Sequence, residues 1–334
     1  MKPLHYLGPQ GSFTHQAAAA AAAMLRDGDG GEPALLAAAD VPQIMDAVQR
    51  GEAWGVIAWE NNVEGYVVPN LDMLIDARDA AGFARVGVDI AFDAFVRPDG
   101  DGMDGDGADG AEPAIDGAVV SAHAHGLAQC AGFIAEHRLT PVPAASNAAA
   151  CRDLRPGQVA LGPSICGPLY GLRTWAAGVQ DYRGARTEFL VLAPRDEARA
   201  MLERARAAGV GEFETIITFI PLSTGPGVLA DLLDVLRDAG LNMTSFISRP
   251  IKGHDGTYSF IATIDAAPWQ PRFHAVLEEV AEHGDWVKTL AVYPRRERPN
   301  PPVDDWMLPR GGVRLAGPID GAAEAGDAGR ELLW

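Results

Sequence analysis

The order of secondary-structure elements between residues 213 and 294 constrains the fold of this chain more than any other sequence feature. Strands are expected over 213–222, 241–249, 257–265 and 286–293, and helices over 226–239 and 270–283. Gly240 ends the first helix, and Gly253–Gly256 supplies the turn between the two middle strands. A strand–helix–strand–strand–helix–strand order within about eighty residues is the ferredoxin-like split βαβ arrangement. The sequence therefore predicts a small α/β module at 213–294.

Residues 1–195 alternate strands, loops and helices, which indicates a further α/β region. Strands are expected at 4–7, 54–59, 86–96, 117–121, 158–162 and 189–192, and helices at 41–50, around 71–75, at 126–137, and after Ser12 and Ser146. A chain of 334 residues is long for one core, so at least two domains are expected. Glu and Arg spaced for helical pairing predict a linker helix within 196–212.

Composition excludes several classes of protein. The net charge of −18 argues against a nucleic-acid or anionic-membrane surface, because both require clustered Lys and Arg. Residues 99–112 are almost entirely Gly, Asp and Ala and lack the spacing of an EF-hand loop, so we expect a solvated, disordered insertion there. The Pro-, Gly- and Ala-rich tail, 295–334, is also expected to be disordered.

The cysteines and the N-terminal region predict a cytoplasmic protein. Cys130, Cys151 and Cys166 are odd in number and show no C-x-x-C spacing, which favours reduced thiols. The N-terminal residues contain no apolar core of a signal peptide, and the Ala run at 17–23 is too short to span a bilayer.

No common catalytic signature is present: the sequence lacks G-x-G-x-x-G, a P-loop, H-E-x-x-H and G-x-S-x-G, and its histidines show no metal spacing. Polar clusters at predicted strand ends remain, where open α/β sheets bind ligands. The first cluster is Ser12, Phe13 and Thr14 at a helix start. Its backbone N–H groups and two hydroxyls can hold a carboxylate or phosphate, although simple capping by Ser12 explains it equally well.

Four further clusters are candidates. Glu60, Asn61 and Asn62 follow a buried strand, where unpartnered polar groups are costly, so a ligand cleft is favoured. The others are His123 with Gln129, Ser146 with Asn147, and the run Arg186, Thr187, Glu188 and Phe189. Gln129 is expected on an inward helical face, as a packed amide or a ligand contact. Ser146 can be an N-cap, and Thr187 and Glu188 can move protons or simply alternate along a strand edge.

These clusters, in this order, resemble the prephenate dehydratase family over about residues 4–294. The matching segments are Y-L-G-P-Q-G-S-F-T, I-A-W-E-N-N-V-E-G-Y-V, A-H-A-H-G-L-A-Q-C, Tyr170-Gly171-Leu172 and R-T-E-F. The module at 213–294 resembles the ACT domain of that family. Its glycine loop into the first helix includes Gly227, Val228 and Leu229, and its second effector motif corresponds to Asn242, Ser248, Arg249 and Pro250.

The resemblance implies a bilobed catalytic fold like type II periplasmic binding proteins, with prephenate bound between the lobes. It implies conversion of prephenate to phenylpyruvate, feedback by phenylalanine, no cofactor or metal, and a homodimer or larger oligomer. Thr187, Glu60, Asn61 and Gln129 are its catalytic candidates. The other cluster residues named above are its substrate-binding candidates.

Three positions depart from the family pattern. Glu188 replaces the usual Arg of Thr-Arg-Phe, Asn62 replaces a Ser, and Ala122-His123-Ala124 replaces Ser-His-Pro. A carboxylate in place of a guanidinium would repel a substrate carboxylate, unless Arg186 takes over the charge or Glu188 faces away. Two alternatives therefore stay open beside the dehydratase: a prephenate decarboxylase that forms no aromatic ring, and a non-catalytic amino-acid-binding regulator.

Overall fold

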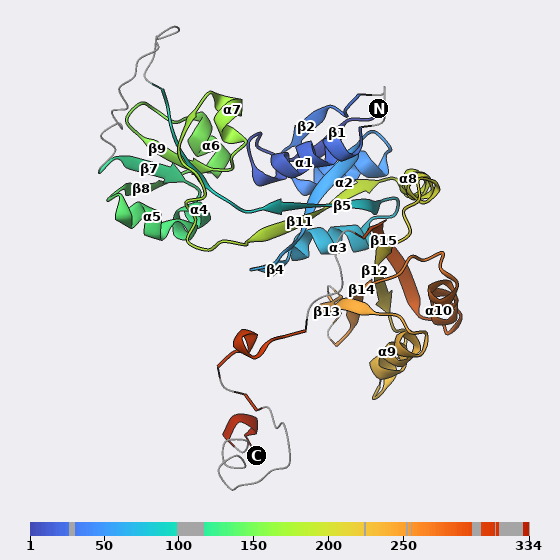
Figure 1. Cartoon of the computed structure of the whole chain (residues 1–334). Coiled ribbons are helices and arrows are strands. Elements are labelled where there is room, and N and C mark those ends of the chain that lie inside the picture. Colours follow the sequence, from blue (N-terminus) through green and yellow to red (C-terminus); the bar gives the residue numbers. More distant parts are fainter. Residues whose placement is uncertain are drawn as a thin grey trace. The chain divides into compact units, whose positions relative to one another are not determined.

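The computed structural model describes residues 1–26, 31–98, 117–223, 225–251, 253–254, 256–295, 302–310, 312–313 and 330–333 (Figure 1). The chain forms two compact units, Met1–Arg295 and Arg296–Trp334. The second unit includes a short 3₁₀ helix, η2, at Asp305–Met307. The predicted insertion at 99–112 lies outside the described residues, as does most of the tail at 295–334.

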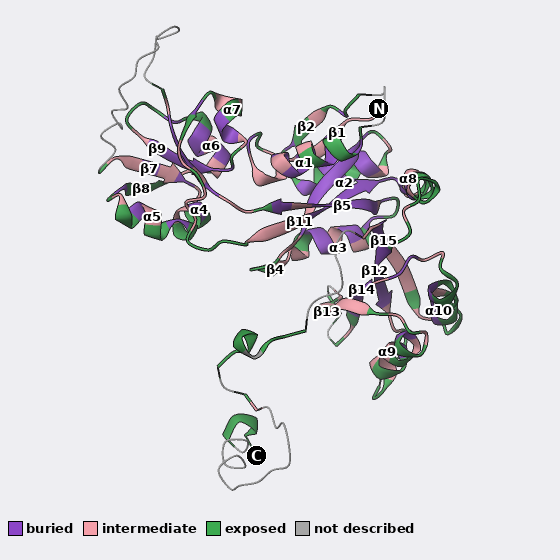
Figure 2. Cartoon of the chain, in the orientation of Figure 1, coloured by how far each residue is buried: buried purple, intermediate pink, exposed green. Residues whose placement is uncertain are grey.

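The first lobe of the larger unit contains a mixed sheet in the order β5-β11-β3-β1-β2. Its strands are β1 (Leu4–Leu7), β2 (Leu35–Ala38), β3 (Trp54–Asn61), β5 (Ala81–Asp89) and β11 (Arg186–Ala193), and the two-residue β4 (Gly65–Tyr66) pairs with β3. Its helices are α1 (Phe13–Met24), α2 (Val41–Gln49), α3 (Val68–Asp76) and α8 (Arg195–Ala207). Figure 2 shows the central strands mainly buried, and two apolar cores cover the two faces of this sheet. These cores fix which strand residues remain open to a ligand.

The second lobe contains a smaller sheet in the order β10-β6-β9-β7-β8. Its strands are β6 (Asp93–Val96), β7 (Val119–Ala122), β8 (Thr140–Pro143), β9 (Val159–Gly162) and β10 (Arg173–Ala176), with helices α4 (Ala124–Gln129), α5 (Ala131–Glu136), α6 (Asn147–Arg152) and α7 (Cys166–Tyr170). The chain passes between the two sheets twice, from β5 to β6 and from β10 back to β11 (Figure 1). This is the bilobed arrangement that the family resemblance implies.

The C-terminal module has the predicted ferredoxin-like order. Its elements are β12 (Phe213–Ile220), α9 (Val228–Asp238), β13 (Met243–Pro250), β14 (Tyr258–Ile264), α10 (Pro271–Glu282) and β15 (Trp286–Pro294), and its sheet runs β13-β14-β12-β15. The apolar sides of α9 and α10 pack on this sheet in a core of their own, which includes Phe219, Leu236 and Phe273. β15 also pairs in parallel with β5 through one residue pair, Ala291 and Gly82. The module therefore continues the sheet of the first lobe.

Some boundaries differ from the sequence prediction for identifiable reasons. The single strand expected at 86–96 is two strands, because the chain leaves the first lobe after Asp89 and enters the second at Asp93. The helix expected at 126–137 is interrupted at Cys130, whose backbone lies outside the helical region. β8 carries two prolines and is exposed throughout, so it has the composition of an edge strand and gave no strand signal.

Candidate active site

The strands that carry the predicted site residues place them on two faces of the sheet. In the antiparallel pair of β3 and β11, Thr187 lies opposite Asn61 and Glu188 lies opposite Glu60. Directly opposed residues share a face, and successive residues of a strand alternate. Thr187 and Asn61 therefore share the face covered by α1, whereas Glu188 and Glu60 lie on the other face, toward the C-terminal module.

On the α1 face, Asn61 fixes the orientation of the Thr187 hydroxyl. The Asn61 Oδ1 atom accepts hydrogen bonds from the N–H groups of Val63 at 2.8 Å and Glu64 at 3.0 Å. These bonds fix the amide, so its Nδ2 must donate to the Thr187 Oγ1 atom, 2.9 Å away. Because the Thr187 oxygen accepts this bond, its own proton is directed elsewhere and can be donated to a ligand.

The start of α1 lies beside the same face. Ser12 is the N-cap, and its Oγ accepts the N–H of His15 at 3.2 Å, while the N–H of Gly11 donates to the Nδ1 of the buried His15 at 3.1 Å. The N–H groups of Phe13 and Thr14 have no acceptor within the helix, as at any helix start. The Phe13 ring contacts Phe92 edge to face at 5.4 Å and packs against the cores of both lobes. A helix start with positive polarity thus faces the boundary between the lobes.

On the second lobe, the predicted His123, Ser146 and Asn147 meet around one turn. The Asn147 Oδ1 accepts the N–H of His123 at 2.8 Å, and the Ser146 Oγ caps α6 by accepting the N–H of Ala149 at 3.0 Å. Gly126 makes the close approach possible, because a Cβ there would lie 2.6 Å from the Asn147 Oδ1. The capping role of Ser146 is therefore present, and the amide of Asn147 holds the loop of His123.

Two hydrogen bonds tie the lobes together beside this region. The Tyr170 hydroxyl on α7 donates to the carbonyl of Gln10 at 2.6 Å, and the Cys166 thiol donates to the carbonyl of Gly11 at 3.1 Å. Both acceptors lie in the loop that leads into α1. α7 of the second lobe thus fixes the start of α1 from the opposite side. Neither residue was a site candidate from the sequence. Tyr170 lies in a segment that matches the family, but a contact across 155 residues or more cannot be read from that motif.

The other face of the sheet holds the charged residues. The Arg186 guanidinium pairs with Glu188 at 2.8 Å and with Asp89 at 3.1 Å. It lies over Gly87, where a Cβ would stand 2.2 Å from the Arg186 Nη2. Asn62 holds the same segment, because its Oδ1 accepts the N–H of Arg186 at 2.7 Å. The structure therefore does not bring Arg186 and Glu188 beside Thr187, and the replacement of Arg by Glu at position 188 does not place a carboxylate on the Thr187 face.

Arg85 and Glu214, which no sequence motif marks, complete this charged cluster. The Glu188 carboxylate uses one oxygen for Arg186 and the other for Arg85, whose Nε is 3.2 Å away. Arg85 also pairs with Glu214 of β12 at 3.1 Å, and its guanidinium lies 5.3 Å above the ring of Tyr293. Burial raises the pKa of Glu60, and the nearby Arg85 acts in the opposite direction.

Two predicted residues differ from expectation in their burial. Gln129 is exposed at the end of α4, and its backbone carbonyl accepts the N–H of Asp181 at 2.8 Å, so the expected inward position is wrong. Gln129 is the last residue of α4, and the next residue, Cys130, leaves the helical region. Phe189 is 2% exposed and belongs to the core of the first lobe, which leaves no surface for a substrate.

The predicted effector residues separate into two groups. Val228 and Leu229 line a cavity of about 530 Å³ in the C-terminal module with Tyr258 and Phe260, and Gly227 precedes α9 with a φ of +95°. The second group is Asn242, Ser248, Arg249 and Pro250 on and before β13, and none of these lines the cavity. Arg249 instead makes a two-pronged ion pair with Asp72 of α3, at 3.2 and 3.3 Å.

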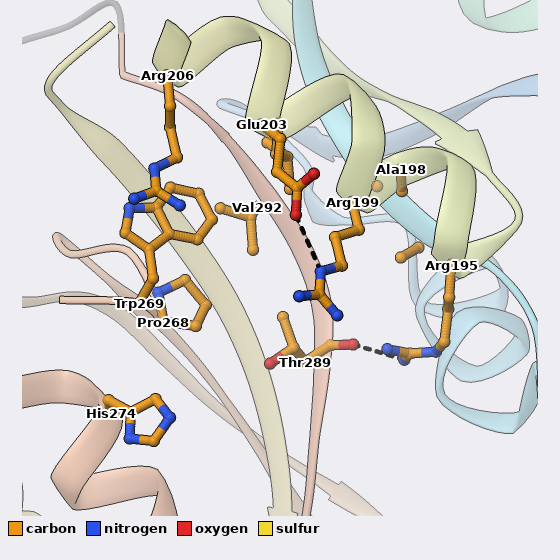
Figure 3. A pocket seen from close by; sticks show the side chains of 13 residues that line it. Arg195, Ala198, Arg199, Glu203, Arg206, Pro268, Trp269, His274, Thr289 and Val292 are labelled. Carbon is orange, nitrogen blue, oxygen red and sulfur yellow. Dashed lines mark hydrogen bonds and ion pairs between the residues drawn. The ribbon is translucent and has the colours of Figure 1, made fainter. Parts of the chain in front are cut away.

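A second cavity, of about 390 Å³, lies among α8, α10 and β15 (Figure 3). Three arginines reach it from α8: Arg195 donates to the carbonyl of Thr289 at 2.7 Å, Arg199 pairs with Glu203 at 3.2 Å, and Arg206 lies 4.7 Å above the ring of Trp269. No predicted site residue lines this cavity. Within the described ranges, no group of three or more His, Cys, Asp or Glu could hold a metal ion, and no helix is long and apolar enough to cross a membrane.

The fold and the polar residues at the lobe boundary define a bilobed α/β enzyme with a ferredoxin-like C-terminal module. The family model of prephenate dehydratase matches residues 4–197. A prephenate dehydratase of Mycobacterium sp. (strain JLS) is 34% identical over 272 residues, which cover 78% of each chain. The chain belongs to the prephenate dehydratase family.

Solved structures agree on the fold. A prephenate dehydratase from Arthrobacter aurescens, solved in complex with L-Phe, superposes with a TM-score of 0.66 at 23% identity, covering 99% of this chain and 98% of that one. The quorum-quenching acylase GqqA superposes with a TM-score of 0.69 at 22% identity, with 88% and 98% covered. At such identities the similarity supports the shared bilobed fold alone. The predicted fold class is confirmed.

Proposed function

We propose that this enzyme converts prephenate to phenylpyruvate with loss of carbon dioxide and water, at the boundary between the two lobes. In this reaction the bond from the ring to its carboxylate breaks, and its electron pair enters the ring. The bond to the ring hydroxyl breaks in turn, and the hydroxyl leaves with a proton as water. Formation of the aromatic ring drives both steps, so the enzyme has to bind a dianion, orient it, and supply a proton.

The observation that carries this proposal is the hydrogen bond from Asn61 to Thr187. It leaves the Thr187 hydroxyl proton for the departing hydroxyl of the substrate. The start of α1, at Phe13 and Thr14, supplies backbone N–H groups for a substrate carboxylate, and this favours an anion despite the net charge of −18. Glu60, Arg186 and Glu188 support the strands from the other face and do not contact the substrate in this scheme.

The test is an assay for phenylpyruvate with variants at Thr187. Thr187→Val keeps the shape but removes the proton, so we expect kcat to fall by about 10²–10⁴-fold with a much smaller change in KM. Thr187→Ser should recover most of the activity. The exposed Thr174 of β10 provides a matched control, and Thr174→Val should leave kcat unchanged. Full activity of Thr187→Val would remove Thr187 from the mechanism.

The same assay addresses the two alternatives. The non-aromatising decarboxylase was suggested by the three departures from the family pattern, and the one that changes a charge, Glu188, lies on the face away from Thr187. A non-aromatic product would nevertheless establish it. Ligand binding without turnover would favour the amino-acid-binding regulator.

We also propose that residues 213–294 form an ACT regulatory domain that binds phenylalanine, with a catalytic domain at 1–195 and a linker at 196–212. The ferredoxin-like order, the positive φ of Gly227 and the cavity beside Val228 and Leu229 support this. The Arthrobacter aurescens prephenate dehydratase was solved with L-Phe bound, which supports the choice of ligand. Calorimetric titration with phenylalanine, with and without Leu229→Asp, tests the site. Light scattering tests the homodimer that we expect for such a module.

A further inference from the structure

A chain of ion pairs connects the C-terminal module to the strand that carries Thr187. Glu214 of β12 pairs with Arg85 of β5, and Arg85 pairs with Glu188 of β11, which in turn pairs with Arg186. The side chains of Arg85, Glu188 and Glu214 are only 22%, 15% and 11% exposed. We call Glu214, Arg85 and Glu188 the charged bridge.

The bridge is held in one arrangement from several directions. Charges that are largely removed from water need matched partners, because an unpaired charge there strongly destabilises the fold. Each Glu188 oxygen pairs with a different guanidinium. Arg85 pairs with two carboxylates through different nitrogens, and its guanidinium also lies over the Tyr293 ring. If Arg85 moved with one carboxylate, it would lose its ion pair with the other. A displacement of β12 is therefore transmitted to Glu188.

The position of Glu188 makes that transmission relevant to catalysis. It is the residue directly after Thr187 on β11, and its side chain anchors the strand from one face while Asn61 holds Thr187 on the other. Near-attack geometry tolerates little error, and a displacement of about 1 Å can cost a hundredfold in rate. The bridge lies on the face opposite the substrate side, so it acts on Thr187 through the backbone.

Other contacts also join the module to the first lobe. Arg195 of α8 donates to the carbonyl of Thr289, and Leu190 and Leu192 of β11 share an apolar core with Ile216 and Leu290 of the module. Two further polar contacts end on α3. Arg249 pairs with Asp72, and the Lys288 ammonium donates to the carbonyls of Leu74 at 3.3 Å and Ile75 at 2.6 Å. None of these contacts involves Glu188. The charged bridge does, and Glu188 is the residue directly after Thr187 on β11.

We infer that Arg85 is a positioning residue for Thr187: by joining Glu214 of the C-terminal module to Glu188, it sets the placement of the Thr187 hydroxyl. The inference rests on the proposed role of Thr187 in prephenate turnover. It also gives the glutamate at position 188 a function, because an arginine there could not join Arg85. The module then influences the reaction through strand placement, without any contact with the substrate.

The test compares three variants with a matched control in the full-length protein. Glu214→Gln weakens the bridge while it keeps the side-chain shape, Arg85→Met removes the bridge, and Arg85→Lys keeps a charge that reaches only one carboxylate. Glu203→Gln, in the exposed pair with Arg199 on α8, is the control. We measure kcat, KM and the melting temperature, and follow hydrogen exchange of the backbone amides of β11.

The expected result is a fall in kcat of about tenfold to a hundredfold for Arg85→Met, with KM changed by less than about threefold. The kcat values of Glu214→Gln and Arg85→Lys should lie between those of Arg85→Met and wild type. The backbone amides of β11 should exchange faster in the variants that lose more activity. Glu203→Gln should match wild type in both measurements. Unchanged kcat in Glu214→Gln and Arg85→Lys at temperatures where both are folded would overturn the inference, whatever the melting temperatures.

Failure of the proposed function gives a different result. A wild-type protein that forms no phenylpyruvate contradicts the proposed activity, and hydrogen exchange then decides on the bridge alone. Faster exchange of β11 in Glu214→Gln, but not in Glu203→Gln, would support the connection. Identical β11 exchange in both variants would refute it.

Discussion

Replacing Glu188 with the arginine that is usual in the family should destabilise this protein. In the structure the Glu188 carboxylate lies between two guanidiniums, with Arg186 at 2.8 Å and Arg85 at 3.2 Å. Glu188→Arg removes both ion pairs and places a third positive charge between these partners. At an effective dielectric constant of about 20, two like charges about 4 Å apart repel by roughly 4 kcal/mol.

The net effect is smaller than the sum of two such contacts. Arg186 is partly exposed and can move into solvent, and Arg85 keeps Glu214 as a partner. Allowing about half of the repulsion to relax leaves a loss of about 4 kcal/mol. For a domain of this size, about 2–4 °C of melting temperature per kcal/mol gives a decrease of roughly 8–16 °C.

Thermal unfolding followed by circular dichroism measures this change. The control is the same substitution at Glu203, which also pairs with an arginine but is 58% exposed. Surface pairs contribute little, so Glu203→Arg should change the melting temperature by less than about 2 °C. If Glu188→Arg and Glu203→Arg melt within about 2 °C of each other, the charges around position 188 do not stabilise the fold and the reasoning is refuted.

Three further substitutions test other parts of the structure. Burial raises the pKa of Glu60, so the ionised carboxylate disfavours the folded state at any pH above the ordinary pKa of glutamate. Glu60→Gln should therefore raise the melting temperature at pH 7. This gain should vanish as the pH falls toward 4.5. A pH-independent difference would contradict this. Gly82→Ala puts a Cβ 2.6 Å from the Cβ of Ala291 and should lower the free energy of unfolding, measured in urea, by about 1–3 kcal/mol. An unchanged urea midpoint would show that β15 moves freely from β5. Lys288→Met removes an ammonium from the last carbonyls of α3 and should cost about 1.5–3 kcal/mol, while Lys2→Met serves as a control away from α3.

Local patterns in the sequence were sufficient for much of the fold. The Ser12 cap follows directly from a short polar side chain before an Ala-rich helix, and the module at 213–294 follows from the order of its elements. Short edge strands gave no comparable signal. β8 consists of four exposed residues, two of them prolines, and its pairing with β7 depends on tertiary context.

The site was harder to predict because motif order does not state which face a side chain takes. Thr187 and Glu188 are neighbours in the motif, yet a one-residue step along a strand separates the substrate face from the face toward the module. Arg85 lies in an apolar strand, and its partner Glu214 is 129 residues away, so only the folded sheet brings them together. Gln129 is a further example. The sequence predicted one helix over 126–137 with Gln129 on its inward face, but α4 ends at Gln129 and the side chain is exposed.

The seam between β15 and β5 joins the module to the first lobe by more than its backbone ladder. Only one residue pair, Gly82 with Ala291, connects the two sheets, but both apolar cores of the first lobe continue into the module, through residues such as Val292 on one face and Leu290 on the other. Parts that share buried apolar contacts tend to open as one cooperative unit in native-state exchange. The amides of β12 and β15 should therefore keep their protection together with those of β5 and β11, whereas α9, which packs in a core of the module alone, should exchange earlier.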